Sequence, residues 1–180
     1  MRRVILSIMV SLDGFIEGPN KEVDWHLVDA ETEAFMYDAL SSASGILLGR
    51  KAYDLLKKYW PSSDSIIAHH MNYLPKIVFS QTLHSATNWK NTSFVNSNLA
   101  GQVKALKSKP GKDLILFGGA EIATLFKQYN LIDQYWLFVN PVVLGSGTPL
   151  FKDPKTTLRL SLLDMKIFRN GIVLLKYINE

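Results

Sequence analysis

Short apolar runs of strand length alternate with helix-patterned segments through roughly the first two-thirds of the chain. We expect one helix from the cap Asp29 as far as Ala43 and a second over 50–59. A third starts at the cap Asn98 and ends before Pro110, and a fourth follows Gly119 and includes Tyr129. The expected strands are mostly apolar, as in parallel sheets whose faces are covered by helices. They lie at 4–10, 45–49, 76–79, 92–95 and 113–117. The alternation predicts an α/β domain built on parallel strands.

The end of the chain changes character. A long apolar strand is expected at 134–143, followed by strands at 158–163 and 172–178. The last two are joined through Asn170-Gly171, a hairpin turn signal. The chain of 180 residues therefore predicts one α/β domain over 1–180, with a mixed, mostly parallel sheet and a C-terminal antiparallel hairpin.

Composition excludes several classes of site. The chain has no cysteine, so it has no disulfide framework, thiolate zinc site or cysteine nucleophile, and a reducing cytoplasm fits best. The net charge of +4 comes from scattered residues, and the lysines between 104 and 112 are typical of a solvated helix face rather than a nucleic-acid site. The longest uncharged stretch, 134–151, is broken by Pro141, Gly145 and Gly147, so we expect no membrane span.

The segment Phe117-Gly118-Gly119 connects an expected strand to an expected helix. Two glycines let a ligand approach the backbone closely, and the free N–H groups of the helix N-terminus suit a pyrophosphate. The alternative is a tight turn without a ligand. Glu121 favours that alternative, because its charge competes with an anion at the helix start.

Two further strand ends carry polar residues. Arg50 and Lys51 stand at a helix start, where cations oppose the helix dipole, which hints at phosphate binding rather than ordinary surface charge. The segment Ser80-Gln81-Thr82 adds hydroxyl and amide groups, although by itself it is only a turn. Because ligands bind outside the carboxyl ends of parallel strands, these junctions predict one groove.

Acidic and aromatic residues before the first expected helix are candidates for chemistry. Asp13 or Asp29 could donate a proton if an apolar cleft raises the carboxyl pKa; otherwise Asp13 stabilises a turn and Asp29 caps the helix. Trp25 faces a substrate or belongs to the core. None of the four histidines, including His26, has a partner at metal-ligand spacing, so we expect no metal site.

Seven segments, taken in order, resemble the dihydrofolate reductase-like superfamily, and most closely the branch containing the C-terminal reductase domain of bacterial riboflavin biosynthesis proteins. They are 11–16 (SLDGFI), 24–25 (DW), 47–53 (LLGRKAY), 78–83 (VFSQTL), 117–121 (FGGAE), 131–133 (LID) and 140–151 (NPVVLGSGTPLF). The resemblance implies a three-layer fold with helices on both faces of the sheet.

The resemblance also implies that NADPH lies across the strand ends. The segment Gly49-Arg50-Lys51 would meet the 2′-phosphate and pyrophosphate, and the segment Ser80-Gln81-Thr82 would make a second adenosine-side contact. Ile16 and Gly18 would lie near the nicotinamide. Gly118, Gly119, Ala120 and Glu121 would form the diglycine turn, which holds a cis peptide in dihydrofolate reductases. Asp13 and Asp29 are then the catalytic candidates, and Trp25 and Asp29 the substrate-binding ones.

Three positions depart from the folate-reducing pattern. Ala52 replaces a threonine, Ala30 stands where a carboxylate follows Trp25, and Phe138 replaces a supporting threonine. The resemblance therefore favours a pyrimidine, pteridine or flavin-precursor substrate, as in a 5-amino-6-(5-phosphoribosylamino)uracil reductase of riboflavin biosynthesis, without a deaminase domain. The alternatives are dihydrofolate reductase activity, a non-catalytic NADPH-binding or regulatory module, and a basic nucleic-acid binder. The apolar final hairpin and residues 135–138 predict a homodimer.

Overall fold

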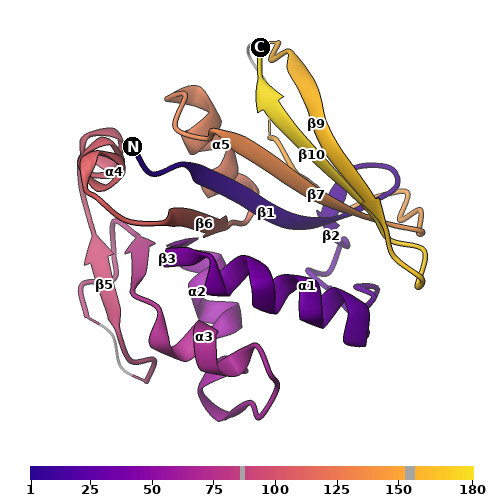
Figure 1. Ribbon diagram of the computed structural model, residues 1–180, viewed down its shortest axis with the longest axis horizontal. Coiled ribbons are helices and arrows are strands. Elements are labelled where there is room, and N and C mark those ends of the chain that lie inside the picture. Colours follow the sequence, from indigo (N-terminus) through magenta and orange to yellow (C-terminus); the bar gives the residue numbers. More distant parts are fainter. Residues whose placement is uncertain (86–87, 153–156) are drawn as a thin grey trace.

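An eight-stranded sheet runs through the centre of the computed structural model, which describes residues 1–85, 88–152 and 157–180 (Figure 1). Its strand order is β5-β4-β3-β6-β1-β7-β10-β9. The strands are β1 (Val4–Ser11), β3 (Ala43–Gly49), β4 (Lys76–Phe79), β5 (Thr92–Val95), β6 (Asp113–Phe117), β7 (Gln134–Asn140), β9 (Leu160–Ile167) and β10 (Val173–Asn179). A separate two-stranded sheet pairs β2 (Phe15–Glu17) with β8 (Thr148–Pro149).

The strands from β5 to β7 pair in parallel, whereas β10 runs antiparallel to both β7 and β9. This mixed sheet confirms the expected architecture, including the C-terminal antiparallel hairpin. Phe168 and Gly171 close the turn of that hairpin, because the Gly171 N–H donates to the Phe168 carbonyl oxygen at 3.0 Å. The φ of Gly171 is +91°, a value that favours glycine.

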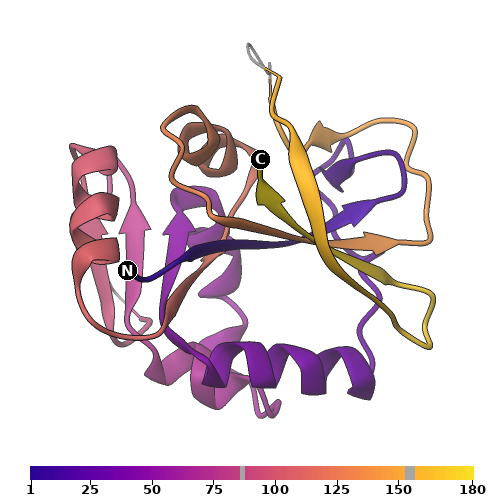
Figure 2. The ribbon, with the colours of Figure 1, turned by 45° about the horizontal axis from the view of Figure 1, so that its top comes forward.

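Helices cover both faces of the sheet, giving three layers (Figure 2). The helices are α1 (Ala30–Ser41), α2 (Arg50–Leu56), α3 (Ala68–Tyr73), α4 (Leu99–Ser108) and α5 (Ala120–Gln128), with a 3₁₀ turn, η1, at Trp60–Ser62. Helices α1, α2 and α3 share one hydrophobic cluster with Ile46 and Leu48. Leu47, between these two strand residues, packs in the opposite cluster with α4 and α5. The period-2 alternation of strand side chains thus supplies both layers.

The helix starts follow local hydrogen-bonding rules. Asp29 caps α1, because its carboxylate accepts the Thr32 N–H at 2.9 Å while the Thr32 hydroxyl accepts the Asp29 N–H at 2.9 Å. Asn98 caps α4 by accepting the Gly101 N–H at 3.2 Å. Among the described helices, none is long and apolar enough to cross a membrane.

Several boundaries differ from the expectations. Ala43 belongs to β3 and not to the preceding helix, and the helix expected over 50–59 ends at Leu56, before the 3₁₀ turn that contains Pro61. Strand β7 ends at Asn140 rather than at residue 143, because Pro141 has no N–H to continue the ladder. The pairing of β2 with β8 was not expected.

Candidate active site

The pairing register brings four strand ends to one level of the sheet. Gly49 pairs with Phe79, which pairs with Val95, while Leu48 pairs with Phe117. The polar residues that follow these four strands are therefore neighbours, because all four strands run in the same direction. The edge that forms here is where open α/β sheets bind ligands.

The sheet also splits beside this edge. Strand β1 pairs with β6 only over Val4–Leu6, whereas it stays paired with β7 as far as Ser11. Ser7, Ile8 and Met9 thus face a gap between β1 and β6, and all three line a cavity. The gap connects the strand-end turns with the layer of helices α1 to α3.

This cavity has a volume of about 1210 Å³, more than a single drug-sized ligand needs. It contains most of the residues assigned to the cofactor from the sequence. Those that line it are Ile16, Gly49, Arg50, Lys51, Ser80, Gln81, Thr82, Gly118, Gly119, Ala120 and Glu121. The structure therefore brings the three predicted turns together, although the contact of each residue with NADPH stays a prediction.

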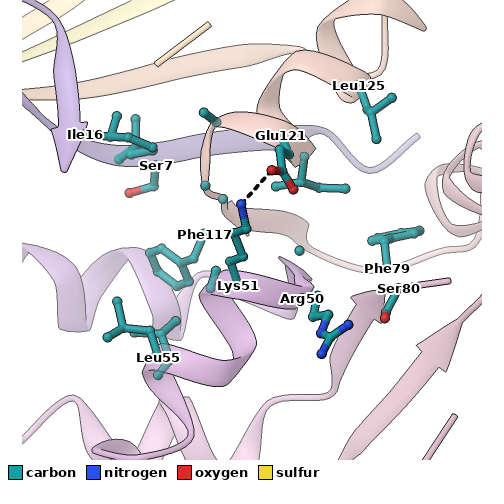
Figure 3. A pocket seen from close by; sticks show the side chains of 18 of the residues that line it. Ser7, Ile16, Arg50, Lys51, Leu55, Phe79, Ser80, Phe117, Glu121 and Leu125 are labelled. Atoms are coloured by element: carbon teal, nitrogen blue, oxygen red, sulfur yellow. Dashed lines mark hydrogen bonds and ion pairs between the residues drawn. The ribbon is translucent and has the colours of Figure 1, made fainter. Parts of the chain in front are cut away.

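Two basic side chains, Arg50 and Lys51, line the cavity beside the strand-end turns (Figure 3). The Arg50 Nη1 donates to Thr82 Oγ1 at 2.6 Å, and the Arg50 Nε lies 3.5 Å from Asp54 Oδ2. The Lys51 Nζ donates to Glu121 Oε1 at 2.6 Å. This hydrogen bond raises the pKa of Lys51 and lowers the pKa of Glu121. The first turns of α2 and α5 are thus joined by this pair.

The three glycines at these turns have different packing. A Cβ at Gly49 or at Gly118 would lie 2.9 Å from the Ile122 side chain, so both glycines let α5 approach the sheet. A Cβ at Gly119 would meet no atom within 4 Å. Gly119 is therefore the glycine that leaves space in the cavity itself. The cis peptide implied for this turn is not found, since no cis peptide bond occurs among the described residues.

Hydrogen bonds fix the Ser80 turn. The buried Ser80 Oγ accepts the backbone N–H of Thr82 at 3.3 Å and of Leu83 at 3.0 Å. The side chain of Asn96, from the segment after β5, donates to the carbonyl oxygens of Ser80 and Leu83, both at 2.6 Å. The turn is held from two sides, with the Thr82 hydroxyl directed to Arg50.

Four sequence-predicted residues do not line the cavity: Asp13, Gly18, Trp25 and Asp29. The Asp13 carboxylate accepts the Ser11 hydroxyl and the N–H groups of Leu144 and Gly145, so it ties two loops together. The Ser11 hydrogen bond lowers the pKa of Asp13, and the Thr32 N–H lowers that of Asp29. Neither pKa is raised as a proton donor in an apolar cleft would require, because both carboxylates accept hydrogen bonds from neighbouring groups. These contacts fit the alternatives of a turn residue at Asp13 and a helix cap at Asp29, and a catalytic role for either stays a prediction.

Gly18 and Trp25 lie in the segment between β2 and α1. The Gly18 N–H donates to the Glu22 carbonyl oxygen at 2.9 Å, and the Trp25 Nε1 donates to the same oxygen at 3.3 Å. The Trp25 ring also contacts His26 edge-on, with ring centroids 4.3 Å apart. Trp25 therefore supports a residue that does line the cavity, rather than lining it itself.

Several parts of the cavity wall were not predicted from the sequence, and two of them are large. One is the segment 96–100 after β5, whose polar residues before a helix follow the pattern of the other three turns and could have been included. The other includes His26 and side chains from α1, α2, η1 and α3. Their hydrophobic spacing indicates only a core face, so no sequence signal distinguishes them.

Residues 2–174 match the family of the RibD C-terminal domain. The chain belongs to the RibD C-terminal domain family. The chain is also similar to YyaP, an uncharacterized protein of Bacillus subtilis (strain 168). The two are 39% identical over 181 residues, which cover 98% of this chain and 94% of YyaP.

Solved structures share the fold of this RibD C-terminal domain. A provisionally named riboflavin biosynthesis protein from Shewanella sp. PV-4 has a TM-score of 0.79 at 22% identity, with 100% of this chain and 99% of that chain covered. A diaminohydroxyphosphoribosylaminopyrimidine deaminase/5-amino-6-(5-phosphoribosylamino)uracil reductase from Thermotoga maritima has a TM-score of 0.71 at 13% identity. There the match covers 99% of this chain but 57% of that chain. These likenesses confirm the dihydrofolate reductase-like architecture.

Proposed function

We propose that this RibD C-terminal domain is an NADPH-dependent reductase that transfers hydride to a heteroaromatic ring of the pyrimidine, pteridine or flavin-precursor type. The observation that carries the proposal is the convergence of three strand-end turns, with both Arg50 and Lys51, on one cavity. The family supports a reductase, and the cavity supports a phosphorylated dinucleotide. We also propose that residues 1–180 form a single domain.

The residues of the cavity fit this cofactor. Gly119 leaves open space where a side chain would stand, and Lys51 supplies a cation beside it. Arg50 can hold a 2′-phosphate, because a guanidinium binds phosphate through two parallel hydrogen bonds. Bound NADPH supplies the hydride. The chain binds the phosphates, orients the ring toward the gap beside Ser7 and Ile16, and excludes water from it.

The test compares two cofactors on one variant. In Arg50→Ala, we expect the Kd for NADPH to rise about 10-fold or more, as for a lost charged hydrogen bond, with the Kd for NADH nearly unchanged. Arg159→Ala, at an exposed position outside the cavity, is the control. Fluorescence titration gives both constants. Equal losses for NADPH and NADH would contradict the assignment of Arg50 to the 2′-phosphate.

A non-catalytic NADPH-binding module is the second candidate. It is favoured by one observation: neither Asp13 nor Asp29 lines the cavity. Oxidation of NADPH, followed at 340 nm with a panel of pterins, pyrimidines and flavins, distinguishes the two. Tight NADPH binding without oxidation by any of these rings would favour the module.

We further propose a homodimer through β9, the edge strand of the sheet. Its apolar side chains Leu162, Leu163, Met165 and Ile167 are 51–65% exposed. An exposed apolar edge strand is a pairing surface. A single species of dimer mass in light scattering, converted to monomer by Met165→Lys, is the expected result; a monomeric native chain would contradict it.

A further inference from the structure

The cavity continues beyond the cations into the layer of helices. We call this part the helical chamber; its walls include Met36 and Leu40 of α1, Leu56 of α2, Trp60 of η1, and Ile67 and Met71 near α3. Figure 3 shows Leu55 and Phe117 on one side of the Lys51 side chain, with Arg50 and Ser80 on the other. The chamber and the part of the cavity beside Arg50 are therefore two different environments in one cavity.

Charge separates these environments further. Among the described lining residues that α1, η1 and α3 contribute, Glu33 is the one with a charged side chain. The lining cations are Arg50, Lys51 and Lys152, and both lysines neighbour Glu121, at 2.6 and 3.9 Å. Lys57, at the end of α2, is paired with Asp54 at 2.6 Å. A phosphate in the chamber would meet a carboxylate and no cation.

The chamber wall nevertheless carries two polar atoms without partners. The Trp60 Nε1 and the His26 Nε2 are buried and form no hydrogen bond with the described residues. Burial lowers the pKa of His26 to about 4, so its ring is neutral at pH 7. The other ring nitrogen bonds the Ile16 backbone, which leaves Nε2 as an acceptor. A donor and an acceptor among apolar and aromatic side chains suit a planar heterocycle.

We infer that the helical chamber selects an unphosphorylated, planar heteroaromatic ring as the hydride acceptor and rejects a ring that carries a phosphoribosyl group. This inference rests on the proposed function and identifies the substrate class within it. Hydride from NADPH adds to the carbon of a ring C=N bond, the nitrogen takes a proton from water, and NADP⁺ leaves. The π electrons of the C=N bond thus move to the nitrogen and form the new N–H bond.

The test uses matched pairs that differ by a phosphate: riboflavin against FMN, and 6-hydroxymethylpterin against its monophosphate ester. Kd values are measured by calorimetry with and without saturating NADP⁺. We expect the unphosphorylated member of each pair to bind about 10-fold tighter or more, because the phosphate of the other member would be repelled by the Glu33 carboxylate. Equal or tighter binding of the phosphate esters, or no ring binding at all, would overturn the inference. Ring selectivity without any NADP⁺ binding would defeat the proposed cofactor and leave the chamber assignment standing.

Two variants locate the selection. Glu33→Gln removes the carboxylate charge and should reduce the ratio of the two Kd values within each pair about 5-fold. Asp38→Asn, at an exposed position on the same helix, is the control and should leave this ratio unchanged. Trp60→Phe should raise the Kd of the unphosphorylated rings about 2- to 10-fold, because one hydrogen-bond donor is lost. An unchanged difference in Glu33→Gln would show that the chamber charge does not select the ligand.

Discussion

Two adjacent glycines give a sharp test of how the turn after β6 works. Alanine at Gly118 places a Cβ 2.9 Å from Ile122 Cγ2, whereas alanine at Gly119 meets no atom within 4 Å. The backbone of Gly119, at φ −88° and ψ 173°, is open to any residue. Ile122 is only 5% exposed, so it cannot move aside freely. The same substitution should therefore have opposite consequences at the two positions.

We expect Gly118→Ala to lower the free energy of unfolding by about 1–3 kcal/mol, the usual cost of an overpacked core. For a chain of this size that is a fall in Tm of roughly 2–12 °C. Gly119→Ala should fold as stably as the native chain, or gain about 0.4–1 kcal/mol from the stiffer unfolded chain. Its Cβ occupies the cavity, however, and should weaken NADPH binding about 10-fold or more.

Urea denaturation and NADPH fluorescence titration, on both variants together, measure these effects. Native-like binding of NADPH by Gly119→Ala would contradict this prediction, since the turn would then lie away from the cofactor. The prediction is also refuted if Gly118→Ala is as stable as the native chain, because Ile122 would then tolerate the added methyl group.

Three further predictions address individual charged groups. Lys76 is buried, its Nζ donates to three carbonyl oxygens at 2.8–3.1 Å, and burial lowers its pKa to about 8 from 10.5. The unfolded chain binds that proton more tightly, so raising the pH favours the folded chain. The free energy of unfolding of the native chain, minus that of Lys76→Met, should therefore rise by up to about 3 kcal/mol between pH 7 and 10.5. A difference that does not change with pH would contradict this prediction. Glu121→Gln removes a negative charge from the first turn of α5 and should tighten NADPH binding about 2- to 5-fold by titration, whereas weaker binding would give Glu121 a positive role. Asp29→Ala removes the cap of α1, so it should lower the Tm in a thermal melt and leave the Kd for NADPH unchanged. Loss of turnover without loss of stability would instead support a catalytic role for Asp29.

The sheet and the three turns that line the cavity were predictable because both follow from local patterns. The apolar runs at 4–10 and 113–117 are long enough to identify strands, and parallel strands place their carboxyl ends at one edge. Arg50 and Lys51 could be selected as candidates for this cavity because cations at a helix start are unfavourable without an anion. In each case the signal lies within a few residues of the site that it predicts.

Other features depend on contacts between distant segments. Strands β2 and β8 have three and two residues, too few for a periodic signal, and they pair across 130 residues of chain. The helical chamber forms only when α1, η1 and α3 pack together, and its side chains also read as ordinary core. Asp29 satisfies both a capping and a catalytic pattern; the capping box observed for α1 confirms the first, and the second stays a prediction.

A crystal structure of the chain with NADPH tests the central claim most directly. We predict the diphosphate against Gly119 and Lys51, the 2′-phosphate against Arg50, and the nicotinamide in the gap between β1 and β6, with one ring face open to the helical chamber. Density for NADPH on another surface, or a nicotinamide whose open face is turned away from the chamber, would contradict the account.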